Sequence, residues 1–194
     1  GSATSVVWSG GTNTQWAIPT NWGGCNSPVC GVSATVNPSA YNQPSLISGN
    51  HYVKDLTINP GATLTLQAGA VLHVCGNYLN QGSLVANPSA TIIFDNGSVN
   101  QSISGSLSGP DRFPNLVITK TGGQVLLNND IEIGGNFTTS NNTSIFNSNG
   151  KYVKVAGNFA NANGNTTFSN TGTLGTLEFN GIIPQTYNQG SSAL

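Results

Sequence analysis

The chain has very few charged residues. Only 6% of its 194 residues are Asp, Glu, Lys or Arg, whereas roughly 25% is usual for soluble domains. The five cations are scattered and the formal net charge is −1, so no basic field exists that would attract nucleic acid. Solubility must therefore depend on neutral polar side chains, chiefly Asn, Ser, Thr and Gly.

Long apolar runs and catalytic motifs are also missing. No stretch of about 18 apolar residues occurs, which excludes a membrane-spanning helix. The two histidines, His51 and His73, lie beside no obvious nucleophile, and the sequence has no Gly-x-Ser-x-Gly motif and no glycine-rich calcium repeat. We therefore expect no metal and no cofactor.

Cysteine is scarce, with three residues in all. Cys25 and Cys30 flank the turn-forming segment 26–29, and we expect them to close a small disulfide ring in an oxidising compartment. A metal half-site is the rival interpretation, although no second pair completes it. Cys75 stands where the repeat described below has a small residue, which favours a structural thiol.

What the sequence does contain is a recurring phrase: an apolar, a polar, an apolar and a small residue, followed by Gly-Asn and an aromatic residue. It occurs three times, at 72–78, 131–137 and 153–159. The distance between the last two copies, about 22 residues, is a natural length for one coil of a β-solenoid. Such a coil is made of short strands and Gly-Asn corners.

Short β-prone segments separated by Gly, Asn and Pro extend from about residue 52 to the end. We expect strands at 56–58, 64–66, 71–74, 83–86, 91–94, 116–118, 125–127, 131–133, 152–155 and 176–179. This spacing gives about three strands per coil, and no 3.6-residue apolar period indicates a helix. The predicted fold is an all-β, parallel β-helix or solenoid over residues 51–194, which we expect to be right-handed.

Alternation within the phrase separates inward from outward positions. The predicted outward column consists of His73, Glu132 and Lys154. The predicted structural corner residues are Asn77, Asn136 and Asn158. These asparagines form either a ladder of side-chain amides or simple turns, because Asn tolerates a left-handed backbone.

A longer repeat is superimposed on the coil period. The segment 91–103 resembles the segment 176–187 through a Thr-x-x-Phe strand, a Gly turn and a Gln. The segment 113–118 likewise echoes 54–59 as the opening of a unit. Several coils therefore form one composite unit.

These Asn-Leu-x-Ile openers, Gly-Asn-Phe corners and Phe-x-Gly-x-x-x-Gln closing phrases resemble the repeats of large secreted and cell-surface, adhesin-like proteins of the Bacteroidota. The Trp-rich opening at 8–22 is similar to the leader that precedes such repeats. The resemblance implies a β-solenoid fragment of a longer protein that is secreted or placed on the bacterial cell surface. It supplies no catalytic or binding residue.

All three tryptophans, Trp8, Trp16 and Trp22, lie near the start of the chain. The end coil of a solenoid exposes its apolar interior, so we expect residues 1–50 to form an aromatic-rich cap. The alternative is that the indoles are exposed and stack on sugar rings.

Asp130 and Glu132 are the acidic pair that a glycan-cleaving β-helix would need. Two residues apart on one strand, they would point the same way at about 6.6 Å, which is near the lower limit for an inverting glycosidase. Lys154 would lie about 4.8 Å from Glu132 in the next coil, and this favours an exposed ion pair instead. We assign no catalytic residue.

The predicted function is that of a non-catalytic structural or adhesive module of an extracellular or cell-surface protein, monomeric when isolated. Its partners would be surface glycans or other cell-surface proteins. One alternative is a carbohydrate-binding module that uses the tryptophans or an Asn/Thr-rich face of the solenoid. The other is a polysaccharide-degrading enzyme.

Overall fold

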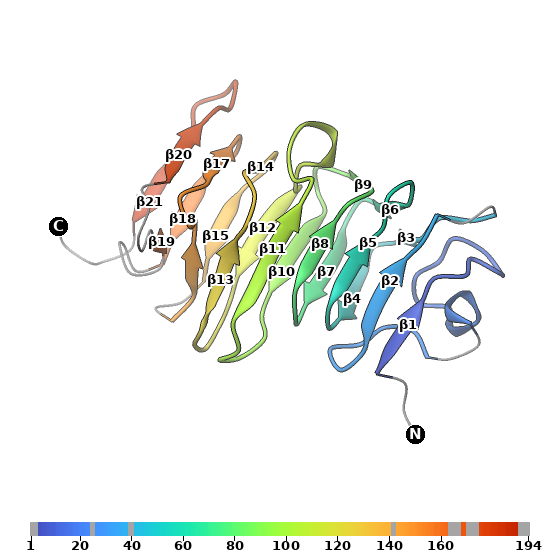
Figure 1. Ribbon diagram of the computed structural model, residues 1–194. Helices are drawn as coiled ribbons and strands as arrows, with labels where there is room; N and C mark the ends of the chain where they lie inside the picture. Colours follow the sequence, from blue (N-terminus) through green and yellow to red (C-terminus); the bar gives the residue numbers. More distant parts are fainter. Residues whose placement is uncertain are drawn as a thin grey trace.

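The computed structural model describes residues 4–23, 26–38, 41–140, 143–162, 168–169 and 175–189. Within these residues the chain is an all-β solenoid with two 3-10 helices of three and four residues. Its parallel strands stack along one axis, and the first and last of the described strands lie at opposite ends of the stack (Figure 1). The predicted fold class is confirmed.

The stack has three faces, numbered here in the order in which each coil visits them. The first face is one sheet of eight strands, β1 (Ser5–Val7), β2 (Ser33–Val36), β5 (Leu56–Ile58), β8 (Tyr78–Asn80), β11 (Gln101–Gly105), β13 (Gln124–Leu127), β16 (Ile145–Asn147) and β19 (Phe168–Ser169). The second face consists of two three-stranded sheets, β3 (Ser45–Leu46), β6 (Thr63–Leu66) and β9 (Ser83–Ala86), then β14 (Ile131–Ile133), β17 (Tyr152–Val155) and β20 (Thr176–Phe179). The third face is one sheet of seven strands, β4 (Gly49–Val53), β7 (Ala70–Val74), β10 (Thr91–Phe94), β12 (Asn115–Ile118), β15 (Phe137–Thr139), β18 (Phe159–Asn161) and β21 (Tyr187–Gln189).

The register of the strands fixes the length of a coil. On the first face Leu56 pairs with Ala34 on one side and with Tyr78 on the other, at equal steps along the chain. On the second face Ile131 pairs with Val153. The hydrogen bond from the Asn158 N–H to the Asn136 side chain in the preceding coil spans 22 residues. The predicted coil length with three strands is therefore confirmed, and each of the predicted strands is present.

The core is the interior of the solenoid, filled by the alternate residues of every strand. Leu72, Ile92 and Leu116, for example, are fully buried and follow one another on successive strands of the third face. Burial of each such side chain contributes about 1.5–3 kcal/mol. Farther along, Phe137 stacks on Phe159 with ring centroids 4.6 Å apart, so aromatic rings continue the same inward column.

The corner asparagines form ladders, but not of the amide-to-amide kind. The side-chain oxygen of Asn136 accepts the backbone N–H of Asn158 at 2.9 Å, and that of Asn158 accepts the N–H of Thr186 at 2.8 Å. Asn77 accepts the N–H of Ser102 in the same way, at 2.9 Å. Among the described residues only Asn149 combines a side chain with a positive φ, so these corners do not use a left-handed asparagine.

The three copies of the phrase do not occupy the same corner. Asn77 lies where the third face turns into the first, whereas Asn136 and Asn158 lie where the second face turns into the third. His73 is therefore on the third face, where Nδ1 lies 2.5 Å from Asp95 Oδ2. Its predicted place in one column with Glu132 and Lys154 was wrong, because the copy at 72–78 is displaced by one face.

The longer repeat is displaced in the same way and keeps its contacts. The Gln101 amide donates to the carbonyls of Val74 and Gly76 in the coil before it. The Gln185 amide donates to the equivalent carbonyls of Val155 and Gly157. The composite unit thus repeats one contact: a glutamine side chain hydrogen-bonds two carbonyls of the preceding coil at a Gly-Asn corner.

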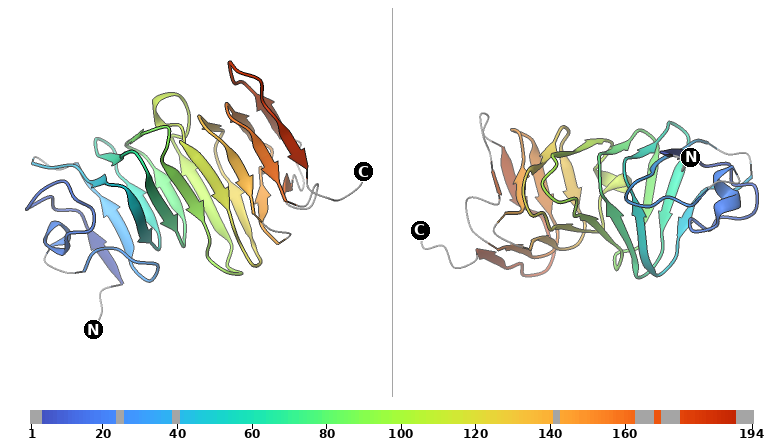
Figure 2. Two further views of the ribbon diagram at one scale, coloured as in Figure 1. Left: turned by 180° about the vertical axis from the view of Figure 1, so that it is seen from behind. Right: turned by 90° about the horizontal axis from the view of Figure 1, so that it is seen from below.

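Residues 8–23 and 26–32, between β1 and β2, cover the amino-terminal end of the stack (Figure 2). Gln15 continues the edge of the second face by pairing in parallel with Ser45. The predicted cap at this end is confirmed. Residues 1–50 also supply strands β1 to β3 and the start of β4, so the sheets begin before residue 51.

The disulfide differs from the predicted one. Cys30 is bonded to Cys75, 45 residues away in sequence, and Cys25 lies outside the described residues. The predicted Cys25–Cys30 ring is therefore wrong, and Cys75 is not a thiol. Cys30 precedes β2 and Cys75 follows β7, so the stacking of coils brings together two cysteines that no local spacing could pair.

One cation is buried. Lys120, with no exposed surface, donates from Nζ to the carbonyls of Asn96 and Val99 and to Gln101 Oε1 at 2.7–2.8 Å. Burial lowers the pKa of this ammonium, and the nearby Asp95 carboxylate partly opposes the shift. Lys120 thereby fixes the loop that leads into β11.

Candidate functional site: the interruption of the second face

The second face is interrupted in one coil, between β9 and β14. After β11 the chain leaves the stack as a loop over residues 106–112, which contains the short 3-10 helix η2 (Gly109–Asp111) and projects from the solenoid (Figure 1). It returns through Phe113, which pairs in parallel with Ile133. Such a departure from the repeat is where surface pockets and function concentrate in repeat proteins.

The loop 106–112 is fixed to both neighbouring coils. The Asp111 carboxylate accepts the N–H of Leu84 at 2.9 Å on the β9 side and the hydroxyl of Ser106 at 2.8 Å. On the β14 side Glu132 accepts the N–H of Gly109 at 3.0 Å. Buried Phe113 packs edge-on against Tyr78, with ring centroids 5.1 Å apart. The loop is therefore a preorganised wall.

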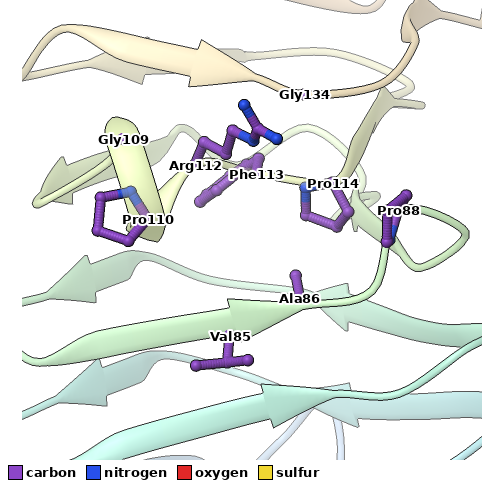
Figure 3. Close-up of a pocket in the computed structure, with 9 residues that line it drawn as sticks. All are labelled: Val85, Ala86, Pro88, Gly109, Pro110, Arg112, Phe113, Pro114 and Gly134. Carbon is purple, nitrogen blue, oxygen red and sulfur yellow. The ribbon is translucent and has the colours of Figure 1, made fainter.

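On the β9 side the wall borders an apolar pocket of about 320 Å³ (Figure 3). Its lining residues are Val85, Ala86, Pro88, Gly109, Pro110, Arg112, Phe113, Pro114 and Gly134. Arg112 is the charged residue of this lining, and its side chain reaches toward Gly134 in the next coil (Figure 3). A Cβ at Gly134 would lie 2.7 Å from Arg112 Nε, so glycine makes room for the guanidinium.

On the β14 side the outward column is a ladder of alternating charge, defined here as Arg112, Glu132, Lys154 and Glu178. Glu132 pairs in register with Lys154, and Lys154 with Glu178. Within the described residues, however, the ion pairs of 4.0 Å or less along this ladder are Arg112–Glu132 at 3.4 Å and Lys154–Glu178 at 4.0 Å. The predicted Glu132–Lys154 pair is therefore replaced, because the loop brings Arg112 within reach of Glu132.

A groove of about 340 Å³ lies along this ladder. Its lining residues are Ser108, Asp130, Ile131, Glu132, Tyr152, Lys154 and Glu178. Tyr152 is 49% exposed. Asp130 Oδ1 accepts the N–H of Tyr152 at 2.9 Å, which fixes the carboxylate beside this residue. We refer to this surface as the ladder groove.

A third hollow, of about 470 Å³, lies on the other side of the ladder. Its lining includes the small residues Gly134 and Ala156 and the exposed Ile182 and Ile183. Arg112 and Glu132 line this hollow as well. The three hollows thus meet at the Arg112–Glu132 pair, which makes it the centre of the irregular surface.

The tryptophans are not part of this surface. Trp8, Trp16 and Trp22 are each at most 3% exposed and pack edge-on, with centroids 4.9 Å apart for Trp8–Trp22 and 4.7 Å for Trp16–Trp22. Their ring faces are therefore closed to a sugar, and the predicted glycan-stacking role of these residues is wrong.

Asp130 and Glu132 do lie in one groove, as their spacing predicted, but both accept hydrogen bonds within the chain. The residues that the sequence alone did not indicate are Ser108, Arg112, Tyr152 and Glu178. For Ser108 and Arg112 the signal was the long gap between the predicted strands at 91–94 and 116–118. Tyr152 and Glu178 lie within the predicted strands at 152–155 and 176–179, at positions whose side chains alternate with the inward-facing ones.

Other site types find little support in the described part of the chain. It contains no group of three His, Cys, Asp or Glu side chains placed to share a metal ion. None of its helices has the length and apolar character needed to cross a membrane. No protein-family model, curated protein or solved structure matches the chain.

Proposed function

We propose that the chain is a non-catalytic structural and adhesive module of an extracellular or cell-surface protein. The observation that carries the proposal is the unbroken stacking of the first and third faces, eight and seven strands long, around one buried core. Since the strands of each described coil are hydrogen-bonded to those of the adjacent coils, and the Cys30–Cys75 disulfide adds a cross-link, such a stack is a stiff rod. A stiff rod suits the projection of a surface toward a partner.

Two further observations support an extracellular location. The Cys30–Cys75 disulfide is of the kind that persists in oxidising compartments. The phrases at 72–78, 131–137 and 153–159, together with the composite repeat, resemble those of secreted, adhesin-like proteins of the Bacteroidota. Both agree with a module exposed at a bacterial surface.

The non-catalytic part of the proposal is supported by the state of the two candidate carboxylates. Glu132 is held by the N–H of Gly109 and by Arg112, and Asp130 by the N–H of Tyr152. Each of these contacts belongs to the fold of the groove. A glycosidase would instead present one carboxyl group to the glycosidic oxygen and the other to water or to the anomeric carbon.

Bead adhesion tests the proposal. Beads that carry the folded chain should be retained under flow on at least one coating of extracellular origin, such as neutral polysaccharide, mucin or bacterial outer-surface extract, while beads carrying albumin are washed away. The same coatings should release no new reducing ends. Failure of retention on every coating would contradict the adhesive role, and reducing ends that disappear in Glu132→Gln would contradict the non-catalytic role.

A further inference from the structure

We propose that the ladder groove binds a neutral saccharide, with Tyr152 as its stacking platform. This inference rests on the proposed adhesive function and names the ligand class for it. It is carried by the combination of a groove, an exposed aromatic ring and charges of both signs on adjacent strands.

The outward side chains of β14, β17 and β20 form a small grid on which the groove is built. Asp130, directly before β14, lies beside Tyr152, which pairs in register with Thr176. Glu132, Lys154 and Glu178 form the next row, about 6.6 Å away along the strands, and neighbouring strands are about 4.8 Å apart. An aromatic ring therefore lies among carboxylates and an ammonium at distances that a single sugar ring can span.

The chemistry of this lining matches hydroxyl groups. A hydroxyl both donates and accepts, a carboxylate accepts several hydrogen bonds and an ammonium donates three. In addition to their contacts within the chain, the Asp130 and Glu178 carboxylates can therefore accept from a sugar while Lys154 donates to it. Tyr152 has an apolar ring face and a polar tip, the combination suited to the C–H face of a pyranose. Hydrogen bonds to charged partners are the stronger ones, which allows a shallow groove to hold a neutral ligand.

The charge pattern argues against charged ligands. The charged side chains that border the groove are Asp130, Glu132 and Glu178 against Arg112 and Lys154. Because the signs alternate along the ladder, no field of one sign attracts a polyanion or polycation. A volume of about 340 Å³ is at the small end of the range of ligand sites, roughly 300–1,000 Å³. One or two sugar rings are the expected occupant.

The groove is also preformed. Asp130 is held by the Tyr152 N–H, Glu132 by the Gly109 N–H, and the strands beneath have buried Ile131 and Val153 as anchors. A rigid site loses little conformational freedom when a ligand binds.

The test is a binding titration with defined probes. Neutral oligosaccharides based on glucose, xylose, mannose and N-acetylglucosamine are screened by saturation-transfer NMR, and the best probe is titrated by calorimetry. Loss of the platform in Tyr152→Ala should weaken binding about tenfold. Tyr152→Phe keeps the ring and should stay within about threefold of the wild type.

Tyr41→Ala is the matched control, since it removes another exposed tyrosine, 86% exposed and outside the groove lining. It should leave the affinity unchanged. The inference is overturned if no probe binds the folded chain at about 10 mM, a range where Kd values near 1 mM are detected. It is also overturned if Tyr152→Ala binds like the wild type, or if only acidic polysaccharides bind. Bead retention that persists in Tyr152→Ala would refute this site and leave the adhesive function standing.

Discussion

Removal of the Cys30–Cys75 disulfide should destabilise the amino-terminal coils by an amount that follows from the chain length it closes. The cysteines are 45 residues apart. Loop-closure entropy for a ring of that size corresponds to about 4 kcal/mol at 25 °C. A ring between Cys25 and Cys30 would contribute only about 2 kcal/mol. The two pairings therefore predict losses of unfolding free energy that differ in size and that affect different cysteine variants.

The tryptophans make the measurement local. All three are buried in the cap beside the first coils, so their fluorescence reports on the region that the disulfide joins. In urea titrations without reductant, Cys30→Ser and Cys75→Ser should each lose about 4 kcal/mol. With a denaturant slope of about 2 kcal/mol/M, this moves the midpoint down by about 2 M.

Cys25→Ser is the internal control and should have the wild-type midpoint. Reductant should lower the urea midpoint of the wild type to that of Cys75→Ser and leave the midpoint of this variant unchanged. The reasoning is refuted if Cys25→Ser is destabilised as much as Cys30→Ser while Cys75→Ser is not. Peptide mapping under non-reducing conditions identifies the bonded pair independently.

Two further predictions concern the core and the corners. The Tyr78 hydroxyl is buried and has no hydrogen-bond partner within the described part of the chain, so Tyr78→Phe should raise the free energy of unfolding by about 1 kcal/mol in urea titrations at pH 7. Burial, reinforced by the Asp111 charge, raises the Tyr78 pKa above its ordinary value of 10. The wild type should therefore lose stability as the pH rises above 10, and Tyr78→Phe should lose less. Parallel curves of unfolding free energy against pH for the two proteins would contradict this. A Cβ at Gly157 would lie 2.5 Å from the Gly135 carbonyl, whereas Gly31 has open space around it. In thermal melts Gly157→Ala should therefore lose about 1–3 kcal/mol of stability. The stability of Gly31→Ala should stay within about 0.5 kcal/mol of the wild type. Equal melting temperatures for these two alanine variants would show that the corner can widen.

The coil architecture could be predicted from the sequence because it depends on local signals. Alternation at 131–133 and 153–155 and the Gly-Asn corners recur at the coil length, and the observed register of Ile131 on Val153 follows from them. The strand after each corner is a weaker signal, because its second inward residue is polar. Buried Thr139, for instance, donates to the Asn161 side chain at 2.8 Å.

The pairing of Cys30 with Cys75 could not be predicted in the same way, because Cys30 precedes β2 and Cys75 precedes β8, and β5 lies between these two strands in the first face. The misplacement of His73 has a related cause. Equal phrases were assumed to occupy equal positions, but a phrase specifies only a strand, a corner and a strand. Which of the three corners the phrase occupies depends on how many strands and loops precede it along the chain.

The candidate site was the least predictable part. Asp130 and Glu132 were found from their spacing, but the partner of Glu132 is Arg112, which belongs to a loop that replaces a strand. Nothing in the repeat indicates where a loop that replaces a strand will place its side chains. The burial of Trp16 and Trp22 likewise depends on how the cap folds back on itself, where Trp22 Nε1 donates to the Trp16 carbonyl at 2.7 Å.

The displacement of the composite unit has a geometric consequence. From 91–103 to 176–187 the chain completes three windings and two thirds of a fourth, and the second copy lies one side earlier around the axis. In an array built by repeating this unit, equivalent surface features would follow a helical path around the rod. They would return to the same side after three units. Partners bound to successive units would point in three directions, which separates bulky neighbours without any spacer between them.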